Sequence, residues 1–160
     1  MTAARKTNAL RILESLGVSH TVAEHPVSEE HFDAAQVAGL LGVSPEILFK
    51  TLVARSSPSQ VVVFCIPGNA ELDLKKAARA AGTRSVELVP LRDLTPLTGY
   101  VRGGCSPIGM KKKFPTWIDE TASLLPSMYV NAGARGLQVI LAPGDLLRVT
   151  EAALADLCVR

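Results

Sequence analysis

The segment 99–115, GYVRGGCSPIGMKKKFP, constrains the fold most, because four glycines and two prolines fall within it. Gly103 and Gly104 lack a Cβ atom, so a ligand can approach their backbone closely, and Pro107 fixes its own φ. We therefore expect a loop between regular elements. Its free N–H groups, followed by the lysines 111–113, suit an anionic ligand that carries a carbonyl group. An ordinary surface turn with a solvated lysine run is the alternative.

The composition of the chain excludes several classes of protein. The chain has 160 residues, 48% of them hydrophobic, which predicts a single domain spanning residues 1–160 with a real core. No apolar run reaches the roughly 18 residues of a membrane span, and the first residues lack the apolar stretch of a secretory signal. Three scattered cysteines argue against a disulfide framework and fit a reducing cytoplasm. The net charge of +2 argues against a protein that coats nucleic acid, and leaves only local phosphate contacts to a few lysines.

Capping residues and apolar periodicity predict the regular elements. Asp33 and Asp73 are suitable N-caps, and Gly42 and Gly82 are suitable helix ends. Helices are expected at 3–16, 34–41, 74–81 and 151–157, with a helical turn at 44–46 and a short helix or turn at 91–97. Strands are expected at 18–22, 49–54, 61–66, 85–89, 117–119, 128–131 and 137–141, the second and third forming a hairpin. The irregular order of these elements predicts an α+β (mixed α/β) fold with a largely antiparallel or mixed sheet.

Lys50 is the strongest single candidate for a functional side chain. Strand alternation places it with Leu48 and Leu52 on one face, while Phe49 and Thr51 lie on the other, and both faces are mostly apolar. A lysine in such a strand must reach water, line a pocket or protect a sheet edge, because an unpaired buried ammonium is costly. Strict alternation points Thr51 away from Lys50. Both can contact one ligand only if the strand ends or bulges there.

No activated nucleophile or metal centre is visible in the sequence. Ser106 is not in a nucleophile elbow, and Cys105 has no histidine nearby to activate it. His20, His25 and His31 are spaced by five and six residues, which does not match the helical pairs or fingers that bind zinc. We therefore expect neither a metal ion nor another cofactor.

Five sequence blocks together resemble one family. They are TNALRILESLGV (7–18), LFKTLV (48–53), ELDLKKAA (71–78), the segment 99–115 and NAGARGLQVIL (131–141). In this order, over nearly the whole chain, they are similar to the YbaK/EbsC family of aminoacyl-tRNA deacylases. That family is in turn similar to the editing domain inserted in bacterial prolyl-tRNA synthetases. The resemblance implies a strongly curved, barrel-like mixed sheet surrounded by helices.

The resemblance also implies the site residues. Lys50 matches the main functional lysine of the family, which holds a phosphate or carbonyl oxygen of the acylated 3′ end. Gly103 begins a stretch that matches the GxxxP loop, whose N–H groups orient the ester carbonyl and stabilise the developing oxyanion. Lys50 and Gly103 are thus the expected catalytic residues. The expected substrate-binding residues are His25, Thr51, Gly104, Ser106, Pro107, Asn131, Gly133 and Gln138.

Two departures from the family pattern bear on the choice of amino acid. The family motif SGGKRG reads NAGARG here, with Asn131, Ala132 and Ala134 at the variable places. His25 stands where many relatives carry an aromatic residue, and a solvated loop histidine is the alternative to a pocket-lining one. The reaction class is therefore better defined by the sequence than the amino acid is.

The function implied by the resemblance is trans-editing of mischarged Cys-tRNA(Pro). The cysteinyl thiolate would attack its own ester, which fits a chain without a visible protein nucleophile. The expected partners are the acceptor end of tRNA(Pro) and, transiently, prolyl-tRNA synthetase, in the cytoplasm. The alternatives are a deacylase that uses bound water on alanyl, seryl, threonyl or small non-protein aminoacyl esters, and a non-catalytic module that binds the acceptor end.

Overall fold

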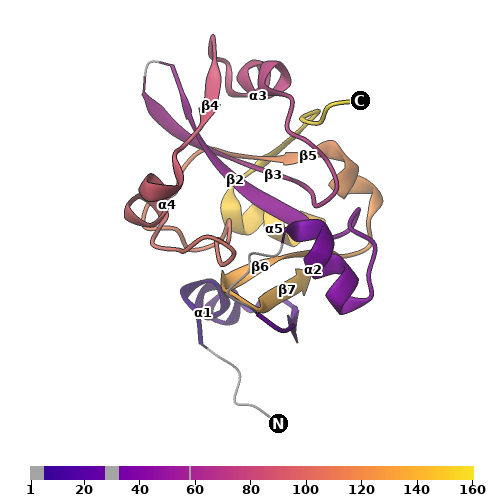
Figure 1. Ribbon diagram of the computed structural model, residues 1–160. Coiled ribbons are helices and arrows are strands. Elements are labelled where there is room, and N and C mark those ends of the chain that lie inside the picture. Colours follow the sequence, from indigo (N-terminus) through magenta and orange to yellow (C-terminus); the bar gives the residue numbers. More distant parts are fainter. Residues whose placement is uncertain (1–5, 28–32, 58) are drawn as a thin grey trace.

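Two β-sheets organise the computed structural model, which describes residues 6–27, 33–57 and 59–160 (Figure 1). A mixed five-stranded sheet has the order β4 (Val86–Leu88), β2 (Phe49–Ser56), β3 (Gln60–Pro67), β5 (Thr116–Asp119), β8 (Ala153–Ala155). An antiparallel three-stranded sheet has the order β1 (Thr21–Glu24), β7 (Leu137–Leu141), β6 (Met128–Ala134). β2 and β3 form the expected antiparallel hairpin, in register from one end to the other.

The two sheets are joined where β2 begins. A parallel bridge pairs Leu48 with Tyr129, and the Tyr129 N–H donates to the Ile47 carbonyl at 2.9 Å. The mixed α/β fold expected from the sequence is confirmed. The sheet, however, is not one closed barrel, because β1 and β4 are each paired on one side only in the described part of the chain.

Helices cover the outside of both sheets. They are α1 (Asn8–Ser15), α2 (Ala34–Leu41), α3 (Leu74–Ala81), α4 (Leu91–Thr98), α5 (Pro143–Thr150) and the 3₁₀ helix η1 (Glu120–Leu124). Asp33 forms a capping box with Gln36, and Asp73 accepts from the N–H groups of Lys75 and Lys76, as the sequence predicts. α1 starts after Thr7, whose hydroxyl caps it. Positions 3–5 of the expected first helix lie outside the described residues.

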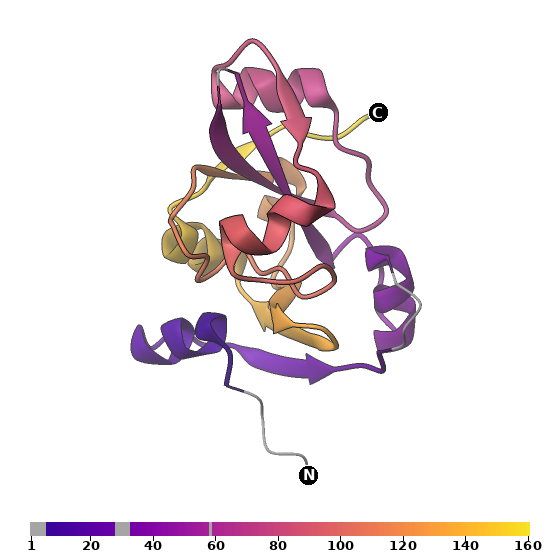
Figure 2. The ribbon, with the colours of Figure 1, turned by 60° about the vertical axis from the view of Figure 1, so that its left-hand side comes forward.

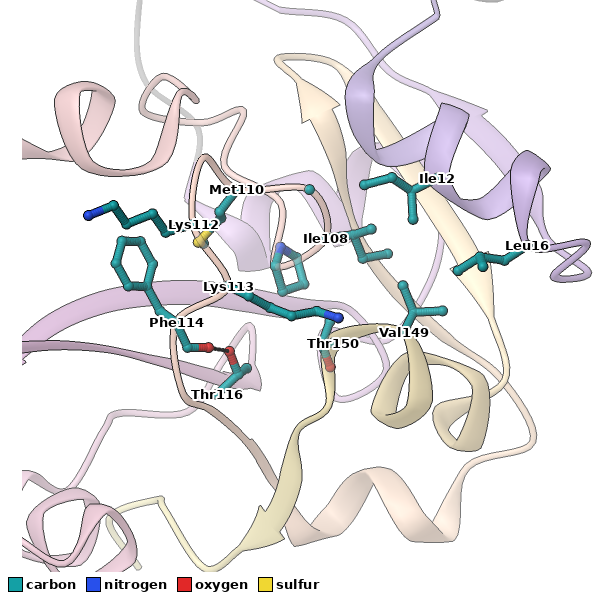
Figure 3. Close-up of a pocket in the computed structure, with 12 residues that line it drawn as sticks. Ile12, Leu16, Ile108, Met110, Lys112, Lys113, Phe114, Thr116, Val149 and Thr150 are labelled. Atoms are coloured by element: carbon teal, nitrogen blue, oxygen red, sulfur yellow. Dashed lines mark hydrogen bonds between the residues drawn. The ribbon is translucent and has the colours of Figure 1, made fainter.

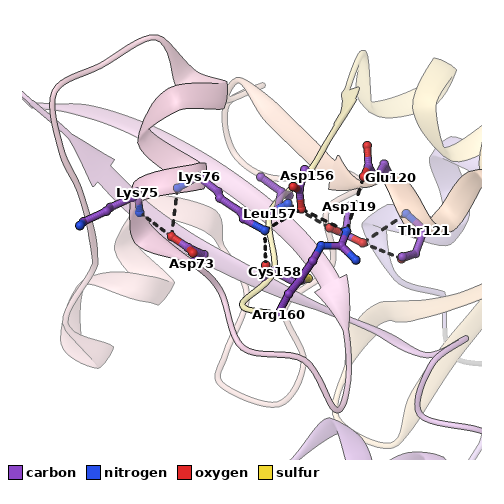
Figure 4. Close-up of polar contacts among 10 residues, drawn as sticks. All are labelled: Asp73, Lys75, Lys76, Asp119, Glu120, Thr121, Asp156, Leu157, Cys158 and Arg160. Atoms are coloured by element: carbon purple, nitrogen blue, oxygen red, sulfur yellow. Dashed lines mark hydrogen bonds and ion pairs between the residues drawn. The ribbon is translucent and has the colours of Figure 1, made fainter.

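The expectation of a last helix at 151–157 is wrong. The helix lies earlier, at Pro143–Thr150, where a proline at the first position is favourable, and it ends at Glu151 with φ 56°. The chain then forms β8, parallel to β5. The Leu157 N–H donates to the buried Asp119 carboxylate at 3.0 Å, so an acidic side chain from β5 holds this segment in extended form (Figure 4). The expected helical turn at 44–46 is a simple hydrogen-bonded turn.

The β2–β3 hairpin is covered on both faces, as its apolar sequence predicts. Ala54, Val62, Phe64 and Ile66 pack beneath α3. Val53, Val61 and Val63 pack against α4 and the loop that follows it. Figure 2 shows α4 and this loop lying in front of the hairpin, between α3 and the β6–β7 pair. None of the helices in the described part of the chain is long and apolar enough to cross a membrane.

Candidate active site

The first half of β2 has a free edge. β4 pairs with Ala54–Ser56 only, and the Val89 N–H donates to the Val53 carbonyl just before it. On the opposite edge the Gly68 N–H donates to the Leu48 carbonyl at 2.7 Å. Backbone groups alternate between the two edges of a strand, so the N–H and C=O of Thr51 point away from β3. No strand among the described residues pairs with them there.

A pocket of about 290 Å³ lies along this free edge, and is called the edge pocket below. Five consecutive residues, 48–52, line it, so both alternating faces of β2 contribute. Its other walls come from α2, α4, the loop 99–115 and the β6–β7 pair. The remaining lining residues are Asp33, Ala34, Val37, Leu94, Arg102, Gly103, Cys105, Asn131 and Gln138.

Lys50 and Thr51 therefore meet in one pocket without a break in the strand. From the sequence we expected that both residues could contact one ligand only if the strand ended or bulged at Thr51, and the strand does neither. The register with β3 is continuous through both residues, and both of them line the edge pocket. The Lys50 ammonium donates to the Gly68 carbonyl at 3.3 Å.

Asn131 holds the loop 99–115 against the β6–β7 pair. Its amide nitrogen donates to the carbonyls of Gly103 at 3.0 Å and Ala134 at 3.1 Å. Its amide oxygen accepts from the N–H groups of Gly133 and Ala134. The side chain has thus no donor left for a substrate, and its role in the structure is to position Gly103. Gly103 itself has φ 80°, a conformation that favours glycine.

Gln138 is a polar residue that lines the edge pocket, and His25 lies beside it. Gln138, in β7, is 4% exposed, and its amide nitrogen lies 3.4 Å from His25 Nε2. His25 Nδ1 lies 3.0 Å from the Pro26 carbonyl oxygen. The Gln138 Oε1 atom is buried and has no hydrogen-bond partner among the described residues. His25 is thus placed beside the pocket through Gln138, and is not itself among the lining residues.

Besides His25, four predicted substrate-binding residues lie outside the edge pocket. Gly104 is buried, and a Cβ there would lie 2.9 Å from the Arg135 backbone nitrogen. Ser106 is fully buried, and its hydroxyl accepts from the Ile108 N–H. A Cβ on Gly133 would lie 2.9 Å from the Tyr100 ring. Pro107 lines a different pocket, described below. In this structure these residues shape the loop and do not face the cavity.

The cysteines are not activated for nucleophilic attack. Burial raises the pKa of the Cys105 thiol to about 11, although a hydrogen bond to Thr98 opposes this shift. Burial also raises the pKa values of Cys65 and Cys158 to about 12. These thiols stay protonated near neutral pH. No group of three His, Cys, Asp or Glu side chains with metal-binding geometry occurs among the described residues, which do not include His31.

Sequence reasoning missed Arg102 and the contribution of α2. Arg102 lines the edge pocket, and no ion pair or hydrogen bond of its side chain occurs within the described ranges. Asp33, Ala34 and Val37 reach the same pocket from the start of α2. The position of Arg102 directly before two glycines was an available signal for a ligand-facing cation. The α2 contacts depend on tertiary packing and left no signal in the sequence.

A second pocket, of about 200 Å³, lies between α1, α5 and residues 107–116, and is called the helix pocket below (Figure 3). Figure 3 shows Ile12 of α1, Leu16 directly after α1 and Val149 of α5 around Ile108. Lys112 and Lys113 stand at its rim, and Lys113 forms an ion pair with Glu151 at 2.8 Å. The hydroxyls of Thr116 and Thr150 in its wall donate to backbone carbonyls.

Known proteins similar to this chain share its architecture. The family model of the aminoacyl-tRNA editing domain matches residues 28–149. A protein of Enterococcus faecalis named "Putative Cys-tRNA(Pro)/Cys-tRNA(Cys) deacylase EbsC" is 47% identical over 153 residues, covering 96% of this chain and 93% of that protein. A crystal structure described as "a putative trans-editing enzyme for prolyl tRNA synthetase" has a TM-score of 0.83 at 27% identity, over 98% of this chain and all of the other. The structure of the hypothetical protein APE2540 shares the fold, with a TM-score of 0.85 at 23% identity over 96% of this chain and all of that one.

Proposed function

The chain belongs to the family of aminoacyl-tRNA editing domains, and we propose that it is a trans-editing deacylase that hydrolyses mischarged Cys-tRNA(Pro). The observation that carries the proposal is the edge pocket. It gathers Lys50, Thr51, Gly103 and Gln138, from three separate parts of the chain, around an unpaired strand edge. The similarity to the Enterococcus faecalis protein, whose name includes Cys-tRNA(Pro), supports the choice of substrate.

The absence of an activated thiol supports a substrate-assisted reaction. The pocket's one cysteine, Cys105, has a raised pKa of about 11, and the Ser106 hydroxyl is buried outside the pocket. The cysteinyl thiolate of the substrate attacks its own ester carbonyl carbon, and a C–S bond forms. The tetrahedral oxyanion then collapses, the ester C–O bond breaks, and the ribose oxygen leaves and takes up a proton. The first product is a cyclic thiolactone, which water opens to cysteine.

In this reaction the protein supplies position and charge. The Gly103 backbone faces the reacting ester and stabilises the oxyanion, and Asn131 holds this glycine in place through its carbonyl. Lys50 and Arg102 are the two cationic residues in the described part of the pocket wall, and they hold a phosphate or carbonyl oxygen of the acylated 3′ end. Holding a thiolate near its own carbonyl can contribute several kcal/mol to an intramolecular step.

Prolyl-tRNA synthetase is the proposed transient partner. A net charge of +2 provides little general attraction for tRNA, so delivery of the mischarged end by the synthetase would supply the affinity that the chain lacks. The similarity to a structure described as a trans-editing enzyme for this synthetase supports the same partner. Addition of the synthetase should therefore lower the concentration of enzyme needed for half-maximal deacylation.

A deacylation panel tests the proposed function. Cysteinyl, seryl, alanyl and prolyl esters of the same tRNA(Pro) are incubated with the enzyme, and products are identified by mass spectrometry. We expect rapid loss of the cysteinyl ester with a thiolactone as first product, because a thiol, with a reference pKa of about 8.5, ionises far more readily than a hydroxyl. Equal rates on all esters would indicate a protein-bound water instead. Binding without hydrolysis of any ester would indicate a non-catalytic module.

A further inference from the structure

The side-chain oxygen of Gln138 has no hydrogen-bond partner among the residues that the structure describes. The side chain lies in the middle strand of the three-stranded sheet, opposite Ala23 and Asn131, and is 4% exposed. Its Oε1 atom is buried and accepts no hydrogen bond from any described residue, although Gln138 is one of the residues that line the edge pocket. An unsatisfied buried acceptor is costly and uncommon in native proteins. A ligand that donates a hydrogen bond at this position would remove that cost.

His25 determines which end of the Gln138 amide is left free. The Pro26 carbonyl can only accept, so His25 Nδ1, 3.0 Å away, carries the ring proton. In the neutral imidazole Nε2 is then an acceptor, and it takes a hydrogen bond from the Gln138 amide nitrogen 3.4 Å away. The amide oxygen is therefore the end that has no partner among the described residues. The Pro26 carbonyl, acting through His25, thus determines which atom of the Gln138 amide is left without a partner among the described residues.

We propose that Gln138 accepts a hydrogen bond from the α-ammonium group of the aminoacyl ester, and that His25 positions Gln138 for this contact. The inference rests on the proposed function. Every aminoacyl ester carries this ammonium, whose charge strengthens its hydrogen bonds to an acceptor. Of the other charged residues in the described pocket wall, Lys50 and Arg102 are donors only, and the Asp33 carboxylate accepts from the Gln36 N–H at the start of α2.

A consequence is that the pocket discriminates between classes of ester. A free aminoacyl ester satisfies the Gln138 oxygen with a charged donor. An N-acylated ester, such as a formylated or peptidyl one, offers a neutral N–H at most and carries an additional group. Sites built to hydrogen-bond a substrate group reject analogues that lack it, since the buried polar atom is then left unpaired. The enzyme should thus act on aminoacyl esters and spare N-acylated ones.

The first test compares cysteinyl-tRNA with N-acetylcysteinyl-tRNA. We expect kcat/KM of the wild-type enzyme to favour the free amine by about tenfold or more. Gln138→Leu keeps the approximate size and removes the acceptor, so the preference should fall to about twofold. The control is Gln60→Leu, the same substitution at an exposed position of β3, which should keep the full preference. A preference that persists in Gln138→Leu would come from the bulk of the acetyl group and would contradict the proposal.

The second test isolates the positioning role of His25. His25→Phe keeps a ring but releases the amide, which can then turn its nitrogen toward the substrate, so the preference should fall by about fivefold. In Gln138→Glu both oxygens accept, and orientation no longer matters. Adding His25→Phe to that variant should change the preference by less than about twofold. An equal loss from His25→Phe in both backgrounds would indicate a merely structural role and overturn the positioning role.

The outcomes separate this inference from the proposed function. If the wild-type enzyme hydrolyses neither ester, the proposed function fails. If it hydrolyses both at equal rates, the deacylase function stands and the recognition of the α-ammonium group is wrong.

A substrate ending in 2′-deoxyadenosine provides one more comparison. If the effect of Gln138→Leu disappears with that substrate and is unchanged by N-acetylation, the Gln138 partner is the ribose hydroxyl, which also contradicts the inference.

Discussion

The edge pocket and the helix pocket share a wall but differ in their unused hydrogen-bonding capacity. Residues of the segment 99–115 line both. In the helix pocket the hydroxyls of Thr116 and Thr150 are bonded to carbonyls, and Lys113 is paired with Glu151. In the edge pocket the Thr51 backbone faces an unpaired edge, and the Gln138 oxygen has no partner in the part of the chain that the structure describes.

This difference indicates which of the two pockets binds a ligand. A polar group left without a partner costs stability, so it persists where something else supplies the partner. Volume does not distinguish the two pockets well, since they measure about 290 and 200 Å³. The helix pocket is therefore interpreted as a packing defect between α1 and α5, and the edge pocket as the site. The predictions below test this comparison.

The largest effect is expected for Lys50→Ala. Loss of the ammonium that holds the acylated end should lower kcat/KM for Cys-tRNA(Pro) by about a hundredfold or more, because misplacement of the reacting ester is costly. Its charge is only half-buried, so the thermal unfolding midpoint should change little. The matched control is Lys75→Ala, an exposed lysine of α3, which should keep full activity. A folded Lys50→Ala enzyme with normal turnover would remove the edge pocket from the mechanism.

Gly103→Ala should have the next largest effect. A non-glycine residue at φ 80° costs about 1–2 kcal/mol, and the added Cβ displaces the backbone that faces the ester. We expect kcat to fall by about tenfold or more, the change expected when one oxyanion donor is misplaced. Gly144→Ala in α5, where a new Cβ meets no atom within 4 Å, is the control and should behave as wild type. Steady-state kinetics and circular dichroism melts separate the two effects.

Asn131→Ala should weaken activity and stability together. Four backbone groups lose their partner, including the Gly103 carbonyl, and the free energy of unfolding should fall by about 1–3 kcal/mol. Because Asn131 acts through Gly103, kcat should fall more than KM rises. Denaturant titration and kinetics on the same preparation measure both. Unchanged kcat in Asn131→Ala would mean that the loop keeps its place without this side chain.

Lys112→Ala tests the helix pocket and should have a small effect. The ammonium is exposed and lies near no proposed reacting group, so kcat should not change. Any rise in KM should stay below about threefold and disappear in high salt, where exposed charges are screened. A loss of kcat comparable to that of Lys50→Ala would reverse the comparison between the two pockets.

The smallest expected effect concerns the pH dependence of stability. The folded-state pKa of Cys105, about 11, lies above the reference thiol value of about 8.5. The unfolded chain therefore loses this proton first as pH rises, so the contribution of Cys105 to stability is complete below about pH 8.5 and is lost by about pH 11. In Cys105→Ala the free energy of unfolding should fall less steeply across this window. Identical slopes in both proteins would show that the thiol ionises freely in the folded state.

The sequence predicted elements whose cause is local. The caps Asp33 and Asp73 and the ends Gly42 and Gly82 were found because capping depends on residues three or four positions apart. The same reasoning failed near residue 151, where β8 forms through pairing with β5, far away in sequence. A helical pattern there was overridden by tertiary hydrogen bonds.

The candidate site shows the same contrast between features with a local cause and features set by tertiary packing. Lys50, Thr51, Gly103, Asn131 and Gln138 were named from the sequence, and the structure brings them to one pocket. Sequence blocks could not reveal that Asn131 uses all its hydrogen bonds internally, or that Ser106 and Gly133 support the loop from behind. Those roles depend on how the loop 99–115 packs against β6, to which Asn131 and Gly133 belong. Tyr100 of the loop lies directly against Gly133 of that strand.

The contact between Asp119 and Leu157 has a consequence for synthesis on the ribosome. Asp119 is fully buried, and one of its oxygens accepts a hydrogen bond from the N–H of Leu157, which is synthesised 38 residues later. The other accepts from the Thr121 hydroxyl, so half of this carboxylate can be satisfied early and half cannot. In a nascent chain that has emerged only as far as α5, the Asp119 carboxylate therefore lacks the hydrogen bond from the Leu157 N–H. Completion of the five-stranded sheet, and with it release of a protease-resistant product, should wait until β8 has left the ribosome.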